Sequence, residues 1–347
     1  MAVAGDRIAV IGAGSWGTAF ASIPAEKGIE TVLWTRREEL ASQISDLHEN
    51  QDYLPNVPLP GSLTATTDIE RAARTAGVVV MAVPSHAFRT IFREVAANLR
   101  PGVPVVSLTK GIEQDSLKRM SEVIREEADL SPSLTAVLSG PNLAKEVAAR
   151  QPSATVVACS DDDVAGSLQD AFMARHFRVY TNPDVVGCEL GGAMKNIIAI
   201  AAGIAAGMGF GDNTRASLIT RGLAEIARLG TRLGGNPLTF SGLAGMGDLV
   251  ATCSSPLSRN RTVGEQLGKG RKLDEIIAEM NMVAEGVKTS RPLFAIAQRA
   301  GADAPITEHV VKVLYEGVSP EEMVASLMTR GAKPELHGID APTRGAN

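Results

Sequence analysis

The first half of the chain alternates short apolar runs with amphipathic stretches, which is the pattern of parallel β-strands joined by crossover helices. The apolar runs are continuous, as expected for parallel strands that are covered on both faces of a sheet. This pattern predicts strands at residues 7–11, 31–34, 78–83, 103–108, 134–138 and 154–158.

After residue 184 the strand signals disappear and helical periodicity takes over. We expect helices at residues 190–210, 215–233, 263–267, 273–280, 287–300, 306–315 and 320–328. The chain therefore predicts an α/β N-terminal Rossmann-type doubly wound sheet followed by an all-α C-terminal domain. We place the sheet domain at residues 1–186, the helical domain at 187–337 and a flexible tail at 338–347.

Composition narrows the class of protein. The chain has 347 residues, more than one hydrophobic core usually supports, and a net charge of -5, which gives no general attraction to nucleic acid or membrane. The apolar run 197–210 is shorter than the roughly 20 residues of a membrane span, and no secretory signal precedes the first strand. Three distant cysteines without a Cys-x-x-Cys and scattered histidines indicate a reducing cytoplasm and no metal site.

A glycine-rich turn directly follows the first predicted strand. Gly12, Gly14 and Gly17 have the spacing of dinucleotide-binding folds, in which they allow a tight turn, backbone approach to a pyrophosphate and close helix packing. The phosphates then meet a helix N-terminus, whose free N–H groups favour anions. The sheet domain is therefore predicted to bind a dinucleotide.

The end of the second predicted strand bears on cofactor choice. NAD-specific folds place an acid there for the ribose 2'-hydroxyl, whereas this chain has Arg36 and Arg37. Two guanidinium groups suit a 2'-phosphate, so NADP is favoured over NAD. The alternative is a pair of solvated arginines neutralised by Glu38 and Glu39.

A single lysine, Lys195, interrupts the apolar stretch 190–210. Burial disfavours its charged form, so the amine can accept the proton of an alcohol that loses a hydride. Alternatively, Lys195 lies near a helix start and its ammonium reaches water. Asp248, on a glycine-flanked loop, can orient Lys195 or simply cap the helix that begins at Leu249. These alternatives stay open.

Two further cations are candidates for an anionic substrate. Lys110 follows the strand 103–108, and ligands of open parallel sheets bind beyond the carboxyl ends of the strands. An ordinary surface lysine is the alternative. Ser258 can cap a helix, and Arg259 adds a bidentate donor in its first turn, where cations are unfavourable unless an anion is near. We therefore favour a phosphate site there.

Taken in order, the motifs resemble bacterial-type NAD(P)-dependent glycerol-3-phosphate dehydrogenase along nearly the whole chain. The matching segments are GAGSWGTA at 12–19, LTKGIE at 108–113, SGPN at 139–142, LGGAMKN at 190–196, GDNT at 211–214, GMGDL at 245–249 and PLSRNR at 256–261. So many motifs in the same order are far more specific than any one of them.

The resemblance implies an enzyme that interconverts sn-glycerol 3-phosphate and dihydroxyacetone phosphate with NAD(P)(H), supplying glycerol 3-phosphate for phospholipid synthesis. It implies Lys195 as general acid/base, with Asp248 and Lys110 beside it in catalysis. The implied substrate contacts are Lys110, Gly140, Asn142, Lys195, Asp248, Ser258, Arg259 and Asn260. The implied cofactor contacts, with the glycine turn, are Ser15, Trp16, Arg36, Arg37, Lys110, Ala144, Arg259, Val283 and Glu285. A homodimer is common in this family.

The chain departs from the family pattern at a few positions. Asn142 replaces the usual serine or threonine, Leu143 the usual phenylalanine, and Ala206 a frequent acidic residue. Two other functions remain as alternatives: another two-domain NAD(P)-dependent hydroxy-acid dehydrogenase, and a nucleotide-sensing regulator that binds the cofactor without consuming it.

Overall fold

The computed structural model describes residues 7–280 and 284–335. It divides after Glu189 into two compact units, within helix α8 (Val185–Gly207) and slightly beyond the boundary expected from the sequence. Val283 and the predicted tail 338–347 lie outside the described residues.

Over the described residues, the first unit is built on an eight-stranded sheet. The strands are β1 (Arg7–Ile11), β2 (Glu30–Trp34), β3 (Leu63–Thr66), β4 (Val78–Met81), β5 (Val105–Ser107), β6 (Thr135–Ser139), β7 (Ser153–Ala158) and β8 (Phe177–Asn182). Their order is β3-β2-β1-β4-β5-β6-β7-β8, and all neighbours are parallel except β6 and β7. The predicted Rossmann-type α/β fold is confirmed.

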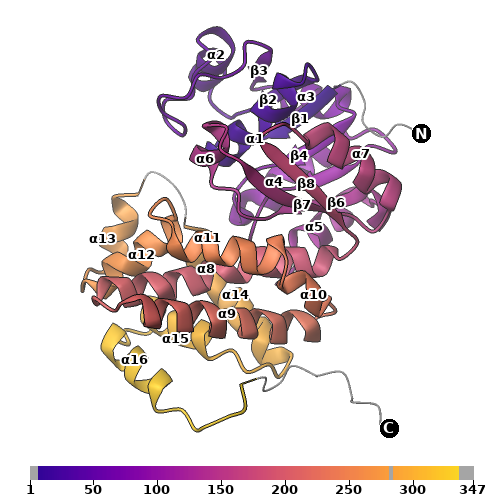
Figure 1. Ribbon diagram of the computed structural model, residues 1–347. Helices are drawn as coiled ribbons and strands as arrows, with labels where there is room; N and C mark the ends of the chain where they lie inside the picture. Colours follow the sequence, from indigo (N-terminus) through magenta and orange to yellow (C-terminus); the bar gives the residue numbers. More distant parts are fainter. Residues whose placement is uncertain (1–6, 281–283, 336–347) are drawn as a thin grey trace, which may run out of the picture. The chain divides into compact units, whose positions relative to one another are not determined.

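Helices cover both faces of the sheet (Figure 1). They are α1 (Ser15–Glu26), α2 (Glu38–Asp46), α3 (Ile69–Thr75), α4 (Ser85–Ala96), α5 (Met120–Ala128), the 3-10 turn η1 (Pro132–Leu134), α6 (Ala144–Ala148) and α7 (Asp162–Phe172). Alternate residues of β1 enter two separate apolar clusters, Ile8 and Val10 in one and Ala9 and Ile11 in the other. This burial on both faces explains why the central strands read as continuous apolar runs.

The two edge strands were not predicted. β3 and β8 are the outermost strands of the sheet; β8 exposes every second residue or more, and in β3 only Leu63 is fully buried. An edge strand has a single neighbour and is partly open to water, so it carries polar and charged residues such as Arg178 and Thr64. Neither strand is therefore a continuous apolar run, which is why the sequence pattern did not predict them.

The expectation that all strands are parallel was wrong for β7 and β8, which both run opposite to β1–β6. β7 pairs antiparallel with β6, through Ser139 opposite Val156 and Val137 opposite Ala158. The connection between them contains only one helix, α6, which has 5 residues. A helix of this length spans about 7 Å, less than the roughly 17 Å of a five-residue strand, so it does not carry the chain back along the sheet as a crossover helix does. β8 then pairs parallel to β7.

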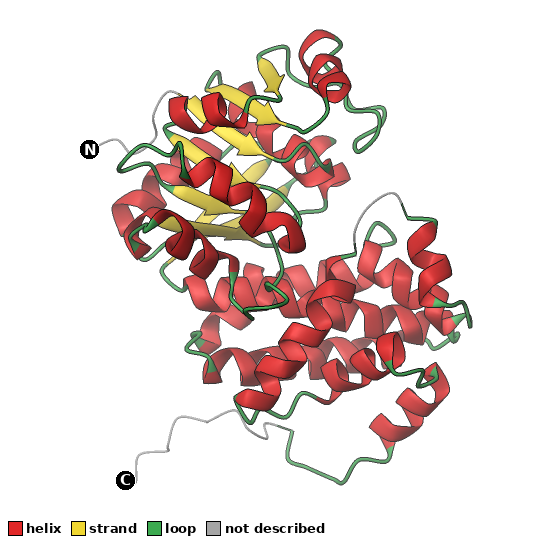
Figure 2. Ribbon diagram, turned by 180° about the vertical axis from the view of Figure 1, so that it is seen from behind, coloured by secondary structure: helices red, strands yellow, loops and turns green. Residues whose placement is uncertain are grey.

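The second unit is helical throughout its described residues, as predicted (Figure 2). Besides the greater part of α8, it contains α9 (Asp212–Arg232), α10 (Pro237–Phe240), the π-helical turn η2 (Leu243–Gly247), α11 (Asp248–Ser254), α12 (Arg259–Gly268), α13 (Leu273–Ala278), α14 (Glu285–Arg299), α15 (Pro305–Tyr315) and α16 (Pro320–Met328). The prediction missed α10 and η2, which have only 4 and 5 residues; α10 begins with a proline and η2 contains two glycines.

Helix α8 is the central apolar helix of this unit. It has 23 residues, so it is longer than its predicted apolar run and long enough, by length and composition, to cross a membrane. However, 89% of its most apolar window is buried inside the protein, as expected for a core helix. Because α8 begins at Val185 rather than at 190, Lys195 lies roughly midway along it and far from the helix start.

Candidate active site

In the glycine turn between β1 and α1, Gly12 and Gly17 are packed tightly against backbone, whereas Gly14 has free space around it. Gly12 has a φ of +120°, and a Cβ on it would lie 2.6 Å from the carbonyl oxygen of Ala82. A Cβ on Gly17 would lie 1.9 Å from the carbonyl oxygen of Gly12, so both positions require glycine. A Cβ on Gly14 would meet nothing within 4 Å. This arrangement fits the predicted approach of a pyrophosphate to the backbone at Gly14.

Ser15 and Trp16 form the first turn of α1. The N-cap residue, Gly14, makes no side-chain hydrogen bond, so no side chain caps the N–H groups of this turn. Ser15 Oγ instead donates to the carbonyl oxygen of Tyr53 at 2.5 Å. The Trp16 ring packs edge-on against Phe20, and its Nε1 is buried without a hydrogen-bond partner. An uncapped helix N-terminus is a suitable anion site.

Arg36 and Arg37 follow β2 and are both exposed. The Arg37 guanidinium forms an ion pair with Asp52 and lies 5.8 Å from the centroid of the Tyr53 ring. The hydrogen bond to Asp52 raises the pKa of Arg37. Asp52 was missed from the sequence, because it belongs to the turn after α2 and not to the end of β2.

Lys110, Gly140 and Asn142 gather beyond the carboxyl ends of β5 and β6. Lys110 Nζ donates to the carbonyl oxygen of Gly140 at 2.8 Å. Asn142 Nδ2 donates at 2.9 Å to Thr155 Oγ1, whose own proton goes to the carbonyl oxygen of Ser139. The Asn142 Oδ1 is left buried without a donor. A buried acceptor in this state favours a ligand or water that can donate to it.

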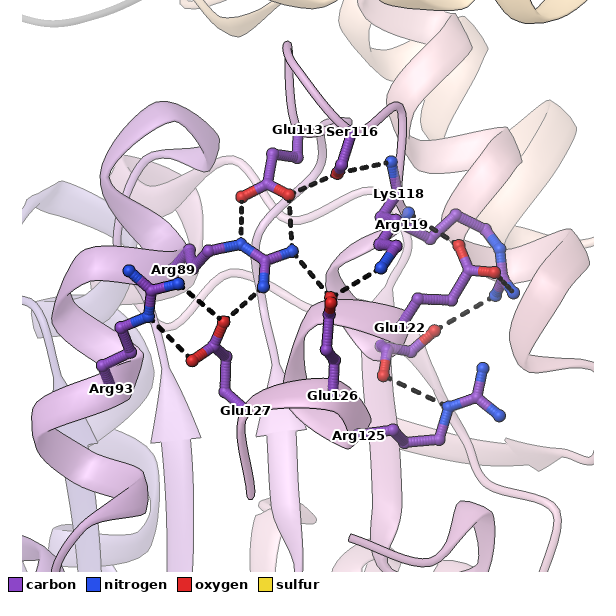
Figure 3. A network of polar contacts seen from close by, with 11 residues as sticks. Arg89, Arg93, Glu113, Ser116, Lys118, Arg119, Glu122, Arg125, Glu126 and Glu127 are labelled. Carbon is purple, nitrogen blue, oxygen red and sulfur yellow. Dashed lines mark hydrogen bonds and ion pairs between the residues drawn. The ribbon is translucent and has the colours of Figure 1, made fainter. Parts of the chain in front are cut away.

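The segment that follows Lys110 is held by an ion-pair network on α4 and α5 (Figure 3). Arg89 is at its centre and donates to Glu113 through Nε at 2.8 Å and Nη2 at 2.7 Å. The same guanidinium also pairs with Glu126 and Glu127. The hydrogen bonds from Arg89 hold the pKa of Glu113 below its usual range. This network fixes the chain three residues beyond Lys110.

In the second unit, the structure brings Lys195 of α8 and Asp248 of α11 together. Lys195 Nζ donates to Asp248 Oδ1, and it also donates to Thr252 Oγ1 at 2.7 Å. Lys195 is 6% exposed and Asp248 is 1% exposed, so this is a buried ion pair. The Lys195 ammonium therefore does not reach water. Thr252 was missed, although its i+4 spacing from Asp248 could have identified it.

Asp248 does not cap its helix. It is the first residue of α11, and the N-cap residue, Gly247, makes no side-chain cap hydrogen bond. Its carboxylate is used instead by Lys195 and by Thr252, whose Oγ1 lies 3.3 Å from Oδ1. Of the two roles left open by the sequence, orientation of Lys195 is the one that the geometry supports.

The N-terminus of α12 carries the remaining predicted cation. Ser258 caps this helix, with its Oγ accepting from the backbone N–H of Arg261 at 3.3 Å. Part of the Arg259 side chain is exposed, but desolvation of its guanidinium lowers the pKa of Arg259, and the charge of Glu285 at the start of α14 opposes this effect. A serine-capped helix start with an accessible arginine is the arrangement expected for phosphate binding.

Two asparagines connect these elements. Asn260 Nδ2 donates to Asn196 Oδ1 at 2.9 Å, and Asn260 Oδ1 accepts from the backbone N–H of Gly286, also at 2.9 Å. Asn196 is the residue after Lys195 and was not assigned a role from the sequence. Through Asn260, the starts of α12 and α14 are therefore tied to α8 beside Lys195.

Glycines set the distance between α8 and α12. A Cβ on Gly203 would lie 2.1 Å from the carbonyl oxygen of Arg261, and one on Gly207 would lie 2.2 Å from that of Glu265. On α12, a Cβ on Gly264 would lie 2.0 Å from the carbonyl oxygen of Ile200. The two backbones are therefore in direct contact, with no room for a side chain.

The predicted site residues fall in both units, and Val283 lies outside the described residues. Within residues 7–280 and 284–335, no three His, Cys, Asp or Glu side chains come together as a metal site. The sheet, its glycine turn and a buried Lys–Asp pair on a helical unit define the class of two-domain dehydrogenases that use a nicotinamide nucleotide.

Comparison with known proteins then identifies the family. The family model described as NAD-dependent glycerol-3-phosphate dehydrogenase N-terminus matches residues 7–165, and the C-terminus model matches residues 184–325. The chain belongs to the NAD-dependent glycerol-3-phosphate dehydrogenase family.

Individual relatives match over almost their whole length. The protein called glycerol-3-phosphate dehydrogenase (NAD(P)+) in Thermobifida fusca is 54% identical, over 96% of this chain and 99% of its own. The protein of that name in Streptomyces coelicolor is 56% identical, over 95% of this chain and 98% of its own. The crystal structure of glycerol-3-phosphate dehydrogenase from Coxiella burnetii is 37% identical, with a TM-score of 0.89, over 93% of this chain and 99% of that one.

Proposed function

We propose that this protein interconverts sn-glycerol 3-phosphate and dihydroxyacetone phosphate with NAD(P)(H), with NADP favoured. Its family and the names of relatives at 54–56% identity support the reaction and the use of either nucleotide. The product of the reductive direction, glycerol 3-phosphate, supplies phospholipid synthesis. The alternative of a hydroxy-acid dehydrogenase is disfavoured by the same relatives.

The observation that carries the proposal is the buried contact of Lys195 with Asp248 and Thr252. In the reductive direction Lys195 Nζ donates a proton to the carbonyl oxygen of the substrate, and in the oxidative direction it accepts the hydroxyl proton. Asp248 and Thr252 hold the Lys195 Nζ in place for this proton transfer. The nicotinamide, when bound, supplies or takes up the hydride.

The phosphate of the substrate docks at the start of α12. Arg259 donates to its oxygens as a fork, and Ser258 and Asn260 shape the helix start beside it. In the first unit, Lys110, Gly140 and Asn142 also contact the substrate. Holding the remote phosphate orients a small molecule whose reacting carbons offer few contacts of their own.

Most of the proposed cofactor contacts belong to the first unit. The pyrophosphate lies at Gly12, Gly14 and Gly17 with Ser15 and Trp16, and the 2'-phosphate meets Arg36 and Arg37. The further cofactor contacts that we propose are Lys110, Ala144, Arg259, Val283 and Glu285.

We also infer a cytoplasmic homodimer that does not insert stably into a membrane or bind nucleic acid. Cys159, Cys188 and Cys253 are all free and buried, which suits a reducing compartment. The long apolar helix α8 is buried in its own unit, and the net charge is -5. The dimer rests on the family resemblance.

Initial-rate kinetics test the function. NADPH or NADH absorbance is followed with dihydroxyacetone phosphate, and in parallel with 2-keto acids as control substrates. We expect turnover with the triose phosphate and none with the 2-keto acids. Turnover of a keto acid alone would make the protein a hydroxy-acid dehydrogenase. NADPH binding without consumption of any substrate would instead make it a nucleotide-sensing regulator.

A further inference from the structure

An acid from outside β2 reaches the arginines that follow this strand. NAD-specific folds carry an acid at the end of β2, and this chain has Thr35, Arg36 and Arg37 there. The structure brings Asp52, from the turn after α2, against the Arg37 guanidinium. The carboxylate that the β2 sequence lacks is thus supplied from a different segment.

The segment that carries Asp52 is fixed against the glycine turn. Asn50 is fully buried, and its Nδ2 donates to the carbonyl oxygen of Ala13 at 3.0 Å and to Thr18 Oγ1 at 2.8 Å. Asn50 Oδ1 accepts from the backbone N–H of Tyr53 at 3.2 Å, and the Tyr53 carbonyl accepts from Ser15. Asp52 therefore lies between two residues that are tied to the predicted pyrophosphate site.

The Arg37 side chain is positioned by this same segment. It pairs with Asp52 and lies over the Tyr53 ring, at 5.8 Å from the ring centroid. Both members of the ion pair are about half exposed, at 49% and 51% of their side-chain surface. An ion pair as exposed as this adds little to the stability of the fold. Its main effect is therefore expected on the binding of a ligand by Arg37.

We propose that Asp52 is a specificity-determining residue for the cofactor, which restrains Arg37 and thereby lowers the preference for NADP over NAD. The carboxylate competes with a 2'-phosphate for the same guanidinium, and its negative charge repels the phosphate. Neither effect acts on the neutral 2'-hydroxyl of NAD. The inference rests on the proposed use of a nicotinamide nucleotide. It explains how one site can bind both NADP and NAD.

The test is direct binding without substrate, by calorimetric titration with NADPH and with NADH. The variant is Asp52→Asn, which keeps the side-chain shape and removes the charge. Glu49→Gln is the matched control, because Glu49 is an acid of the same segment and its carboxylate accepts a hydrogen bond from Gln51 Nε2 at 2.7 Å. Measurements at low and high salt separate charge effects from shape.

We expect the ratio of the NADH to the NADPH dissociation constant to rise by about fivefold in Asp52→Asn, the effect of one exposed ion pair. It should change less than about twofold in Glu49→Gln and shrink at high salt. In an Arg37→Gln background the Asp52→Asn effect should disappear, since the carboxylate acts through Arg37.

Three outcomes overturn the inference: an unchanged ratio in Asp52→Asn, an equal change in Glu49→Gln, or a full effect without Arg37. These are distinct from failure of the proposed function, which would appear as a wild-type protein that binds neither nucleotide. A wild type that binds both nucleotides, with an unaltered ratio in the variant, refutes the role of Asp52 alone.

Discussion

Asn260 Nδ2 donates to Asn196 Oδ1 at 2.9 Å, which joins the neighbours of the proposed acid and of the proposed phosphate anchor. Asn196 follows Lys195 on α8, and Asn260 follows Arg259 at the start of α12. Both asparagines are buried. The hydrogen bond therefore holds α8 and α12 together beside Lys195 and Arg259. The proposed roles of these two residues, proton transfer and phosphate binding, can be tested separately by replacing each one.

Replacing Lys195 with alanine should lower the turnover of dihydroxyacetone phosphate by about 10²–10⁴-fold, the usual contribution of a general acid. The dissociation constant for NADPH should stay within about twofold of wild type, since Lys195 acts on the substrate and is not one of the proposed cofactor contacts. Steady-state kinetics and calorimetry measure the two quantities. Lys269→Ala is the control, because Lys269 pairs with Glu265 on the surface and should be silent. Near-normal turnover of Lys195→Ala would remove the central assignment.

Replacing Arg259 with alanine should act mainly on substrate affinity. A hydrogen bond to a charged group contributes about 1.5–3 kcal/mol, so KM for dihydroxyacetone phosphate should rise by at least about tenfold, with a smaller change in kcat. Arg261→Ala is a matched control, since Arg261 lies on the same helix and pairs with Glu265. A large fall in kcat at unchanged KM would instead place Arg259 at the reacting carbons.

Replacing Gly264 with alanine should destabilise the protein by about 1–3 kcal/mol, as overpacking usually does. The new Cβ would lie 2.0 Å from the carbonyl oxygen of Ile200, and backbone cannot move aside as a side chain can. Gly166 lies within helix α7, and a Cβ there would meet nothing within 4 Å. Gly166→Ala should therefore stabilise by about 0.5–1 kcal/mol. Denaturant unfolding measures both, and equal effects would contradict the packing of α8 on α12.

The ion pairs around Arg89 should make stability depend on acid pH (Figure 3). Arg89 lowers the pKa of Glu113, and Arg93 together with Arg89 lowers that of Glu127. Carboxyl groups with a lowered pKa in the fold stabilise it fully above their unfolded pKa of about 4.3, and this contribution is lost as the pH falls through the folded values.

Arg89→Met should therefore cost on the order of 1–3 kcal/mol at pH 7, where the glutamates are ionised. The difference from wild type should shrink between about pH 5 and pH 3 as these groups are protonated in both proteins. Urea unfolding at each pH measures it. Arg74→Met, at an exposed position of α3, provides the control. A constant difference across this range would show that Arg89 acts by packing and not by charge.

The central part of the fold was predictable because strands in the interior of the sheet have a recognisable hydrophobic sequence pattern. Strands covered on both faces, such as β1 and β4, are continuous apolar runs, and the glycine turn after β1 has a fixed spacing. β3 and β8 lie at the edges and mix exposed with buried positions. The direction of β7 depends on how its connection packs, which no local pattern encodes.

The sequence was enough to select the candidate site residues, but it did not show which of them contact one another. Lys195 stood out because a lone charge in an apolar helix is unusual, and Asp248 because it follows a glycine-rich segment. Their pairing joins positions far apart in the sequence, so spacing could not choose between orientation and capping for Asp248. No sequence pattern pointed to Asp52, because its ion pair with Arg37 forms only when the turn after α2 folds back to the end of β2.

The reversed direction of β7 determines where residues 140–152 lie. A chain that leaves β6 and re-enters the sheet antiparallel does so from the same rim, so this segment never travels across a face to the opposite end. Gly140, Asn142 and α6 are thereby retained at the rim where the glycine turn also lies, with α6 packed against α1. The reversal of β7, which β8 shares, thus keeps the whole β6–β7 connection beside the glycine turn, whereas an all-parallel sheet would use this segment to return to the opposite end.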